Sequence, residues 1–154
     1  MAPEADEVEI VRLGAHGDGI AVTPAGEVFV PGALPGERWR LGADDMPPQR
    51  LSDSPERRAG ICRHFGTCGG CAAQHMAPAM YRAWKHGIVV QAFAHRGIAA
   101  EVAPLESVPL HSRRRAVFGI ARKVSDQRPD TASDRVRIGY REAGRHRLVD
   151  LAQC

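Results

Sequence analysis

The stretch that decides the fold lies at residues 20–41 and reads IAVTPAGEVFVPGALPGERWRL. Short runs of β-branched and aromatic residues are interrupted here by Gly and Pro at regular intervals, which is typical of strands joined by tight turns. We therefore predict strands that begin at residue 20 and run over residues 27–30 and 37–41. Closely spaced strands of this kind indicate a small β-barrel or sandwich.

The sequence on either side of this stretch extends the pattern. Upstream, residues 8–11 read as one more strand, and residues 14–19 form a glycine-rich turn. Downstream, residues 42–60 contain paired aspartates and paired prolines, so we predict a loop or linker there.

Composition bounds the class of protein. The chain has 154 residues, enough for one ordinary domain or two small ones, with 44% hydrophobic and 25% charged residues. This composition excludes a transmembrane span, a collagen-like repeat and wholesale disorder. The acidic residues 1–7 have no apolar run, so they do not resemble a signal peptide, and we expect a cytoplasmic protein.

The net charge of +3 conceals an asymmetry. Residues 1–60 hold 6 arginines and 11 acidic residues, whereas residues 61–154 hold 13 arginines, 2 lysines and 7 acidic residues. The basic second part is the expected contact for a polyanion such as RNA. A bias toward arginine and alanine from a GC-rich genome explains the same composition without any such partner.

Residues 78–97 have the pattern of a helix. Apolar residues recur at spacings of three and four, Pro78 suits the first turn, and Gly97 suits the position just past the end. Beyond this helix, we predict strands at the ranges 101–105, 115–122, 135–141 and 145–151, with a polar loop at residues 123–134.

Three of the four cysteines, Cys62, Cys68 and Cys71, stand within ten residues, and the fourth, Cys154, is the last residue given. Cytosolic thiols stay reduced, so a metal site or a redox pair is favoured over disulfides. Four thiolates suit an iron–sulfur cluster or a zinc ion equally well, and the glycines of this loop allow backbone N–H groups to point at the sulfurs. A redox Cys68–Cys71 pair and three incidental buried thiols are the alternatives.

These residues resemble a known family. Residues 61–75 are similar to the iron–sulfur signature C-x5-C-G-G-C-x-x-Q-H of the SAM-dependent RNA methyltransferases that make 5-methyluridine, and Tyr81 and Lys85 match the helix that follows it. Residues 139–154 are similar to the segment that ends in the fourth ligand. Residues 28–37 resemble the TRAM domain of the same enzymes, an OB-like RNA-binding barrel.

The resemblance implies a mixed α/β, β-rich fold in three parts. A TRAM-like OB β-barrel covers residues 1–55, a cysteine cluster loop covers residues 56–76, and a central α+β domain with one long helix and an antiparallel sheet covers residues 77–154. It also implies a [4Fe–4S] cluster held by Cys62, Cys68, Cys71 and Cys154, with mis-incorporated zinc as the alternative.

The expected partner is RNA, either rRNA or tRNA, and we expect a monomer without a membrane association. The candidate RNA-binding residues are Arg63, Lys85, Arg113, Arg114 and Arg115, although solvated or acid-paired side chains are the alternative for each. Phe65 and Tyr140 are candidate stacking residues, although aromatic side chains more often serve in packing.

Members of this family continue into a domain with the SAM site, a nucleophilic cysteine and a carboxylate base. The uracil ring needs a thiolate at position 6 and a base at position 5, and all four cysteines here are assigned as ligands. We therefore expect an N-terminal fragment with no catalytic residue, inactive by itself, whose intact parent uses SAM. A self-standing zinc or iron–sulfur RNA-binding module and a CxxC redox protein are the other hypotheses.

Overall fold

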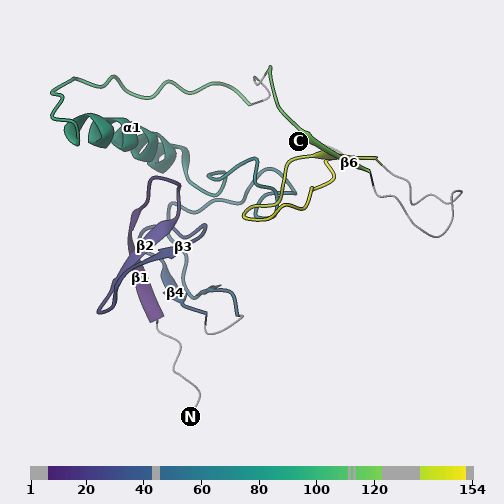
Figure 1. The fold of residues 1–154 in the computed structure, drawn as a ribbon. Coiled ribbons are helices and arrows are strands. Elements are labelled where there is room, and N and C mark those ends of the chain that lie inside the picture. The colour runs from purple at the N-terminus through teal and green to yellow at the C-terminus, as the bar shows by residue number, and fades with distance from the viewer. Residues whose placement is uncertain (1–6, 43–45, 111, 113, 123–135, 152–154) are drawn as a thin grey trace, which may run out of the picture. The chain divides into compact units, whose positions relative to one another are not determined.

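A computed structural model describes residues 7–42, 46–110, 112, 114–122 and 136–151 (Figure 1). The chain divides into two compact units. The first unit combines Met1–Ala59 with Ala73–Glu106, and the second unit combines Gly60–Ala72 with Ser107–Cys154. The segment that carries Cys62, Cys68 and Cys71, residues 60–72, which we call the cysteine loop, therefore belongs to a different unit from the segments that precede and follow it.

The first unit contains a five-stranded antiparallel sheet. Its strands are β1 (Glu7–Leu13), β2 (Gly19–Thr23), β3 (Gly26–Val30), β4 (Arg38–Arg40) and β5 (Gln49–Arg50). The order across the sheet is β3-β2-β1-β4-β5, and each neighbouring pair is antiparallel. The four strands expected before residue 42 are thus confirmed, and the fold is mixed and β-rich as predicted.

Two details of this sheet differ from the expectation. Within the described residues β3 and β5 are the sheet edges and do not pair with each other, so the expected barrel is not closed. The predicted loop at residues 42–60 contains the two-residue strand β5. Pro47 and Pro48 stand directly before β5 and have no N–H to donate, which explains why this strand begins late and stays short.

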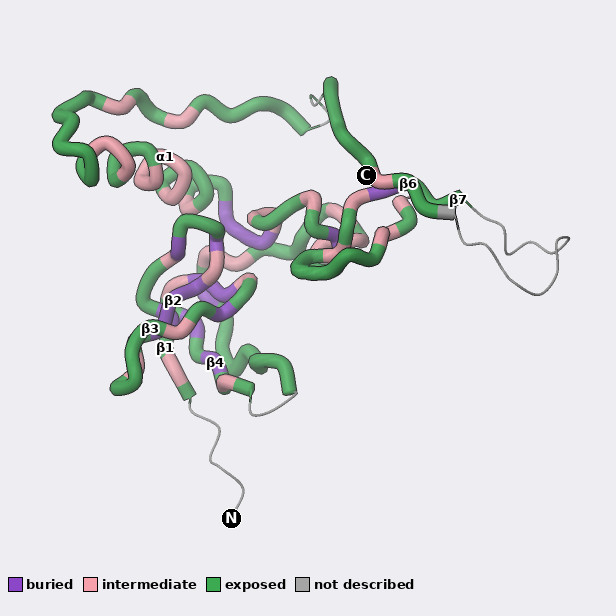
Figure 2. The backbone as a smooth tube through the Cα atoms, in the orientation of Figure 1, coloured by how far each residue is buried: buried purple, intermediate pink, exposed green. Residues whose placement is uncertain are grey.

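The buried residues of the first unit lie mainly in its strands and in the turns between them (Figure 2). Alternation along β1 directs Ile10 into a buried cluster with Val30 of β3 and Trp39 of β4. A Cβ at Gly19 would lie 2.7 Å from side-chain atoms of Ile10 and Ala33, so only glycine allows this approach.

A buried ion pair fixes the segment that follows the sheet. Glu37 has no exposed surface, and its carboxylate accepts two hydrogen bonds from the Arg57 guanidinium, one of them at 2.9 Å from Nη2 to Oε2. The same carboxylate accepts from Trp39 Nε1 at 2.9 Å and from the backbone N–H groups of Leu34 at 3.0 Å and Ser54 at 3.3 Å. Arg57 also donates from Nη2 to the carbonyl of Gly32 at 2.7 Å, so both oxygens of the buried carboxylate and two nitrogens of the guanidinium are hydrogen-bonded.

Arg57 lies in one of two short segments that clamp the base of the cysteine loop. The Arg58 N–H donates to the carbonyl of His75 at 2.8 Å, and the Ala77 N–H donates to the carbonyl of Glu56 at 2.8 Å. Arg57 and Met76 form an antiparallel bridge between these two bonds. We call these residues, 56–58 and 75–77, the loop clamp, because they hold together the two ends from which the loop departs.

The ion pair makes stability depend on pH, which gives a first testable prediction. Burial alone would raise the pKa of Glu37, but the hydrogen bonds from Arg57, Leu34 and Trp39 outweigh it and lower the pKa from 4.5 to about 2. The ionised carboxylate is therefore favoured in the folded state, and the stabilisation is complete above pH 4.5. It should disappear as the pH falls from about 4.5 through about 2, a loss on the order of 3 kcal/mol in the free energy of unfolding.

Denaturant titrations of the chain and of Glu37→Gln between pH 6 and pH 2 measure this effect. The variant should show a flatter dependence on pH over the acidic part of that range. Burial lowers the pKa of His75 from 6.5, so protonation of His75 also reduces stability as the pH falls below 6.5, and this contribution is present in both proteins. Parallel curves for the two proteins below pH 4.5 would contradict the assignment to Glu37.

The predicted helix is confirmed as α1 (Pro78–Ala94). It ends as expected, with Gly97 at a φ of 66° and the Ile98 N–H donating to the carbonyl of Phe93 at 3.0 Å. Trp84 attaches the helix to the sheet, because its Nε1 donates to the carbonyl of Gly14 in the β1–β2 turn at 2.9 Å.

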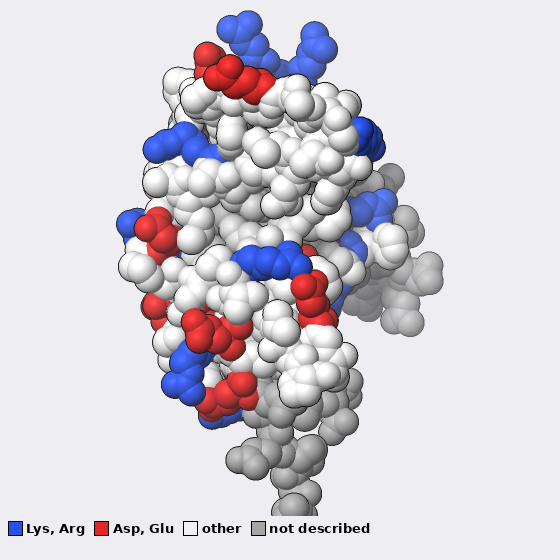
Figure 3. All heavy atoms as spheres, turned by 90° about the vertical axis from the view of Figure 1, so that its left-hand side faces the viewer, with Lys and Arg blue, Asp and Glu red and all other residues white. Residues whose placement is uncertain are grey.

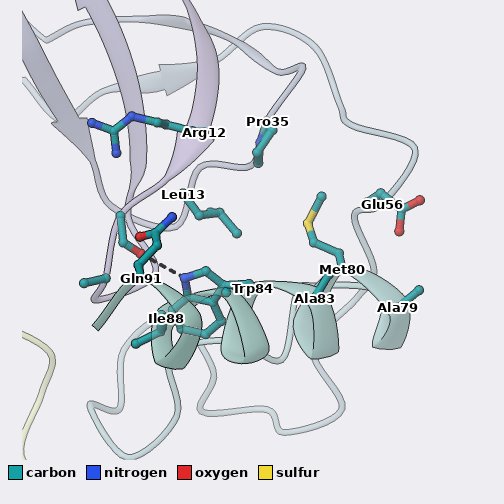
Figure 4. Close-up of a pocket in the computed structure, with 13 residues that line it drawn as sticks. Arg12, Leu13, Pro35, Glu56, Ala79, Met80, Ala83, Trp84, Ile88 and Gln91 are labelled. Atoms are coloured by element: carbon teal, nitrogen blue, oxygen red, sulfur yellow. Dashed lines mark hydrogen bonds between the residues drawn. The ribbon is translucent and has the colours of Figure 1, made fainter. Parts of the chain in front are cut away.

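A pocket of about 640 Å³ lies between α1 and the end of β1 (Figure 4). Met80, Trp84 and Ile88 of the helix face Leu13 and Pro35 across it. The expected apolar face of the helix thus meets the sheet, although no residue of α1 is fully buried and Val89 remains 42% exposed.

Among the described residues of the first unit, basic and acidic side chains are equal in number, with nine of each kind. Arg12 and Glu27 pair at 2.7 Å, and Glu7 pairs with both Arg38 and Arg40. Basic and acidic side chains accordingly lie next to each other on the face shown in Figure 3. Within the described residues, no helix is long and apolar enough to cross a bilayer.

The second unit contains a two-stranded antiparallel sheet of β6 (Gly119–Arg122) and β7 (Val136–Gly139). Both strands lie inside predicted ranges but are shorter. The prediction of a strand at residues 145–151 is wrong, because this segment forms no regular strand. Leu148 forms one isolated bridge with Arg141, and the Val149 N–H donates to the carbonyl of Tyr140 at 2.9 Å. A Cβ at Gly139 would lie 1.9 Å from the carbonyl oxygen of Val149, which shows how closely these segments approach.

The prediction of a strand at residues 101–105 is also wrong. This segment has no strand partner among the described residues, and Pro104 removes one of the N–H donors that a ladder requires. It follows α1 as an irregular segment, and His86 donates from Nε2 to the carbonyl of Val102 at 3.0 Å.

Candidate functional site

The cysteine loop of the second unit is a series of tight turns. The Phe65 N–H donates to the carbonyl of Cys62 at 2.9 Å, and the Cys68 N–H donates to the carbonyl of His64 at 2.9 Å. Gly66 has a φ of 91°, a conformation that glycine adopts without strain. These turns bring the chain from one cysteine to the next without any regular element.

The three described thiols differ in exposure. Cys68 is buried at 9% exposed surface, Cys62 is half-buried and Cys71 is exposed. The Gly70 N–H points at Cys68 Sγ with an N···S distance of 3.4 Å. An N–H directed at sulfur is the environment that stabilises a thiolate, so the donor set of this loop fits a thiolate-bound metal or cluster.

Backbone bonds connect the loop to the segment after β7. The Gly69 N–H donates to the carbonyl of Arg141 at 2.8 Å, and the Ala143 N–H donates to the carbonyl of Thr67 at 3.0 Å. Cys68 and Glu142 form an antiparallel bridge between these bonds. Two parts of the sequence that carry the predicted motifs, more than 70 residues apart, are therefore neighbours in the second unit.

The predicted convergence of four cysteines stays a prediction. Within the part of the chain that the structure describes, no three Cys, His, Asp or Glu side chains gather into a metal-ligand group. Cys154 lies outside the described residues.

The candidate RNA-binding residues fall in both units. Arg114 and Arg115 are exposed in the segment before β6, and Arg63 donates from Nε to His64 Nε2 at 3.3 Å. Lys85 belongs to α1 in the first unit, where its ammonium lies 4.3 Å from the centre of the Trp84 ring. Arg113 lies outside the described residues.

The second unit is strongly basic. Its described residues hold only two acidic side chains, Glu142 and Asp150. The arginines that accompany them are Arg63, Arg114, Arg115, Arg122, Arg137, Arg141, Arg145 and Arg147. The excess of basic residues expected in the second part of the sequence is therefore found in the unit that contains the cysteine loop.

Sequence reasoning did not identify three residues that the structure brings forward: Glu37, Arg57 and Phe118. Glu37 stands directly before β4, two residues ahead of the buried Trp39, so the alternation predicted for residues 37–41 contained a signal for its burial. No comparable signal points to Arg57 as its partner. Phe118 lies beside Tyr140, with ring centres 5.0 Å apart, and only the folded unit shows this.

Comparisons with known proteins identify relatives of this chain. No family model matches it. It is 41% identical over 151 residues to a Brucella suis protein named an uncharacterized RNA methyltransferase, a match that covers 96% of this chain and 34% of the relative. A Caulobacter vibrioides protein of the same description is 38% identical over 152 residues, or 96% of this chain and 35% of the relative.

One relative is named for its substrate. The 23S rRNA (uracil(1939)-C(5))-methyltransferase RlmD of Chromohalobacter salexigens is 33% identical over 160 residues, a match that covers 97% of this chain and 32% of that protein. This chain thus spans about a third of the length of the relatives it matches. Over nearly its whole length, the chain is therefore homologous to proteins of the RNA methyltransferase family.

Proposed function

We propose that this chain is the RNA-recognition and [4Fe–4S]-binding portion of a SAM-dependent RNA (uracil-5-)methyltransferase. The observation that carries this proposal is the homology to RNA methyltransferases over 96% of the chain. The name of the RlmD relative, a 23S rRNA methyltransferase, favours rRNA as the substrate. The setting is the cytoplasm, where rRNA is modified.

Cys62, Cys68, Cys71 and Cys154 are the proposed cluster ligands. The N–H of Gly70 directed at Cys68 Sγ and the turns that carry three thiols through ten residues support this assignment. A bound cluster would cross-link the loop to the C-terminal residue through iron–thiolate bonds. No cysteine then remains as a nucleophile for uracil, so we assign no catalytic residue and no SAM site to this chain.

The second unit is the proposed RNA-binding part, because its arginines greatly outnumber its carboxylates. Of the two acidic side chains among its described residues, Glu142 already pairs with Arg147 at 2.8 Å. Arg114 and Arg115 are exposed in adjacent positions of an extended segment, where consecutive side chains point in opposite directions. These two exposed arginines are the proposed phosphate contacts, one on each face of the segment.

RNA binding as a function of salt tests this proposal. The chain should bind a single-stranded rRNA segment, and an Arg114→Ala, Arg115→Ala double variant should bind more weakly. Each lost phosphate contact should reduce the slope of log K against log salt by about 0.7. Fluorescence anisotropy measured from about 50 to about 300 mM salt gives both the affinity and the salt slope.

The matched control is Arg12→Ala with Arg38→Ala, which removes the same charge from exposed, ion-paired positions of the first unit. This control should leave the slope nearly unchanged. If both double variants lost RNA affinity and salt slope equally, binding would depend on net charge alone. If the unmodified chain did not bind RNA, the proposed function would be rejected.

A further inference from the structure

The second unit contains an open pocket that the proposed function does not use. Its volume is about 690 Å³, and it is lined by Gly69 of the cysteine loop together with residues 117–119 and 140–144. Two aromatic rings meet in its wall: Phe118 and Tyr140 have centres 5.0 Å apart and planes inclined by 56°. This tilted arrangement is a favourable one for an aromatic pair.

Tyr140 is held in place by the cysteine loop. A Cβ at Gly70 would lie 2.7 Å from the Tyr140 ring, so the ring packs directly on the backbone of this glycine. The neighbouring backbone bond from Gly69 to the carbonyl of Arg141 fixes the position further. Tyr140 is half-buried as a result and supports the ring of Phe118.

Phe118 is 43% exposed, and Val117 before it is 89% exposed. The supported ring of Phe118 therefore presents apolar surface to solvent at a preformed position. A ring that is held from one side and open on the other is suited to stack against a flat ligand.

The charge around the pocket selects the class of ligand. Arg141 lines it and donates from Nη1 to the carbonyl of His146 at 3.2 Å, while the Glu142 carboxylate is paired with Arg147. The surroundings are thus cationic and the acidic side chain of the wall is neutralised. Exposed aromatic rings among arginines are the arrangement that proteins use to hold the unstacked bases of single-stranded RNA.

We propose that this pocket binds one unstacked nucleobase of single-stranded RNA, with Phe118 as the stacking surface and Tyr140 as its support. The proposal rests on the proposed function, because the chain must bind RNA for a base to enter the pocket. In addition to the proposed phosphate contacts of Arg114 and Arg115, the chain would then have a base-binding site next to the cysteine loop.

The experiment compares two fluorescein-labelled oligonucleotides of equal length, a single-stranded oligouridine and its abasic counterpart. Phe118→Leu keeps an apolar side chain but removes the π face. It should weaken binding of oligouridine by about 5- to 150-fold, with the salt slope unchanged, and should leave binding of the abasic RNA unchanged. Phe118→Trp should restore oligouridine binding, and its fluorescence should be quenched by oligouridine but not by the abasic RNA.

Ile98→Ala is the control, because Ile98 is also an exposed apolar residue, at 48%, but belongs to the first unit and lies in none of the proposed RNA-binding segments. It should bind both oligonucleotides as the unmodified chain does. Equal affinity of the unmodified chain for oligouridine and abasic RNA would overturn the nucleobase site and leave the proposed RNA binding intact. This comparison decides the question even if Phe118→Leu fails to fold, whereas absence of binding to either RNA would overturn the proposed function as well.

Discussion

Arg57→Ala should lower the free energy of unfolding by about 3 kcal/mol, near the lower end of the range for breaking a buried ion pair. The variant leaves the fully buried carboxylate of Glu37 without its cation and without two charge-assisted hydrogen bonds. Three N–H donors, from Leu34, Trp39 and Ser54, still hold the carboxylate, which is why the upper end of the range is not expected. Urea denaturation followed by Trp fluorescence measures the change.

Two further variants separate the ion pair from general effects of removing arginine. Arg12→Ala removes an exposed arginine whose pair with Glu27 lies in solvent, so its cost should stay below about 1 kcal/mol. Adding Glu37→Gln to Arg57→Ala removes the unpaired charge and should recover part of the loss. If the double variant were less stable than Arg57→Ala alone, the uncompensated charge of Glu37 would not be the cause of the destabilisation by Arg57→Ala.

Cys68→Ser should abolish binding of the iron–sulfur cluster. Cys68 is the buried thiol of the loop and the one that receives the Gly70 N–H, and serine is a poor ligand for iron in this environment. After anaerobic purification, the unmodified chain should be brown and contain about four iron atoms per molecule, as expected for a [4Fe–4S] cluster. The variant should be colourless, with iron near zero.

Thr67→Ser is the control for this substitution, because Thr67 neighbours Cys68 and contributes its backbone carbonyl to the bond with Ala143. Its iron content should match that of the unmodified chain. A colourless unmodified protein with stoichiometric zinc would replace the cluster with a zinc site, and a Cys68→Ser variant that keeps its iron would remove Cys68 from the ligands.

Local sequence patterns predicted the elements that depend on local chemistry. The strands before residue 42 follow from alternation and from glycine and proline turns, and α1 follows from its apolar spacing and from Gly97 at its end. The predictions failed where pairing depends on distant partners. Residues 101–105 have strand-like composition but no strand partner among the residues that the structure describes, and residues 145–151 approach Tyr140 too irregularly to form a ladder.

The candidate site was predictable in part for the same reason. Cys62, Cys68 and Cys71 are recognisable because their spacing is local and unusual. The Glu37–Arg57 pair and the Phe118–Tyr140 pair each join positions about twenty residues apart along the chain, and no periodicity connects them. Such pairs become visible only when the fold has brought their members together.

The loop clamp has a consequence for how metal binding and folding depend on each other. Bringing three thiols of an unfolded chain together costs closure entropy, and here the fold has already joined the two ends of the segment that carries them. Part of the cost of assembling a ligand set is therefore met when residues 56–58 pair with residues 75–77. By thermodynamic reciprocity, whatever binds the thiols only when the loop is closed must also stabilise the folded form of the clamp. Ligand binding by the cysteine loop and the stability of the first unit, to which the clamp belongs, are thus coupled through the chain.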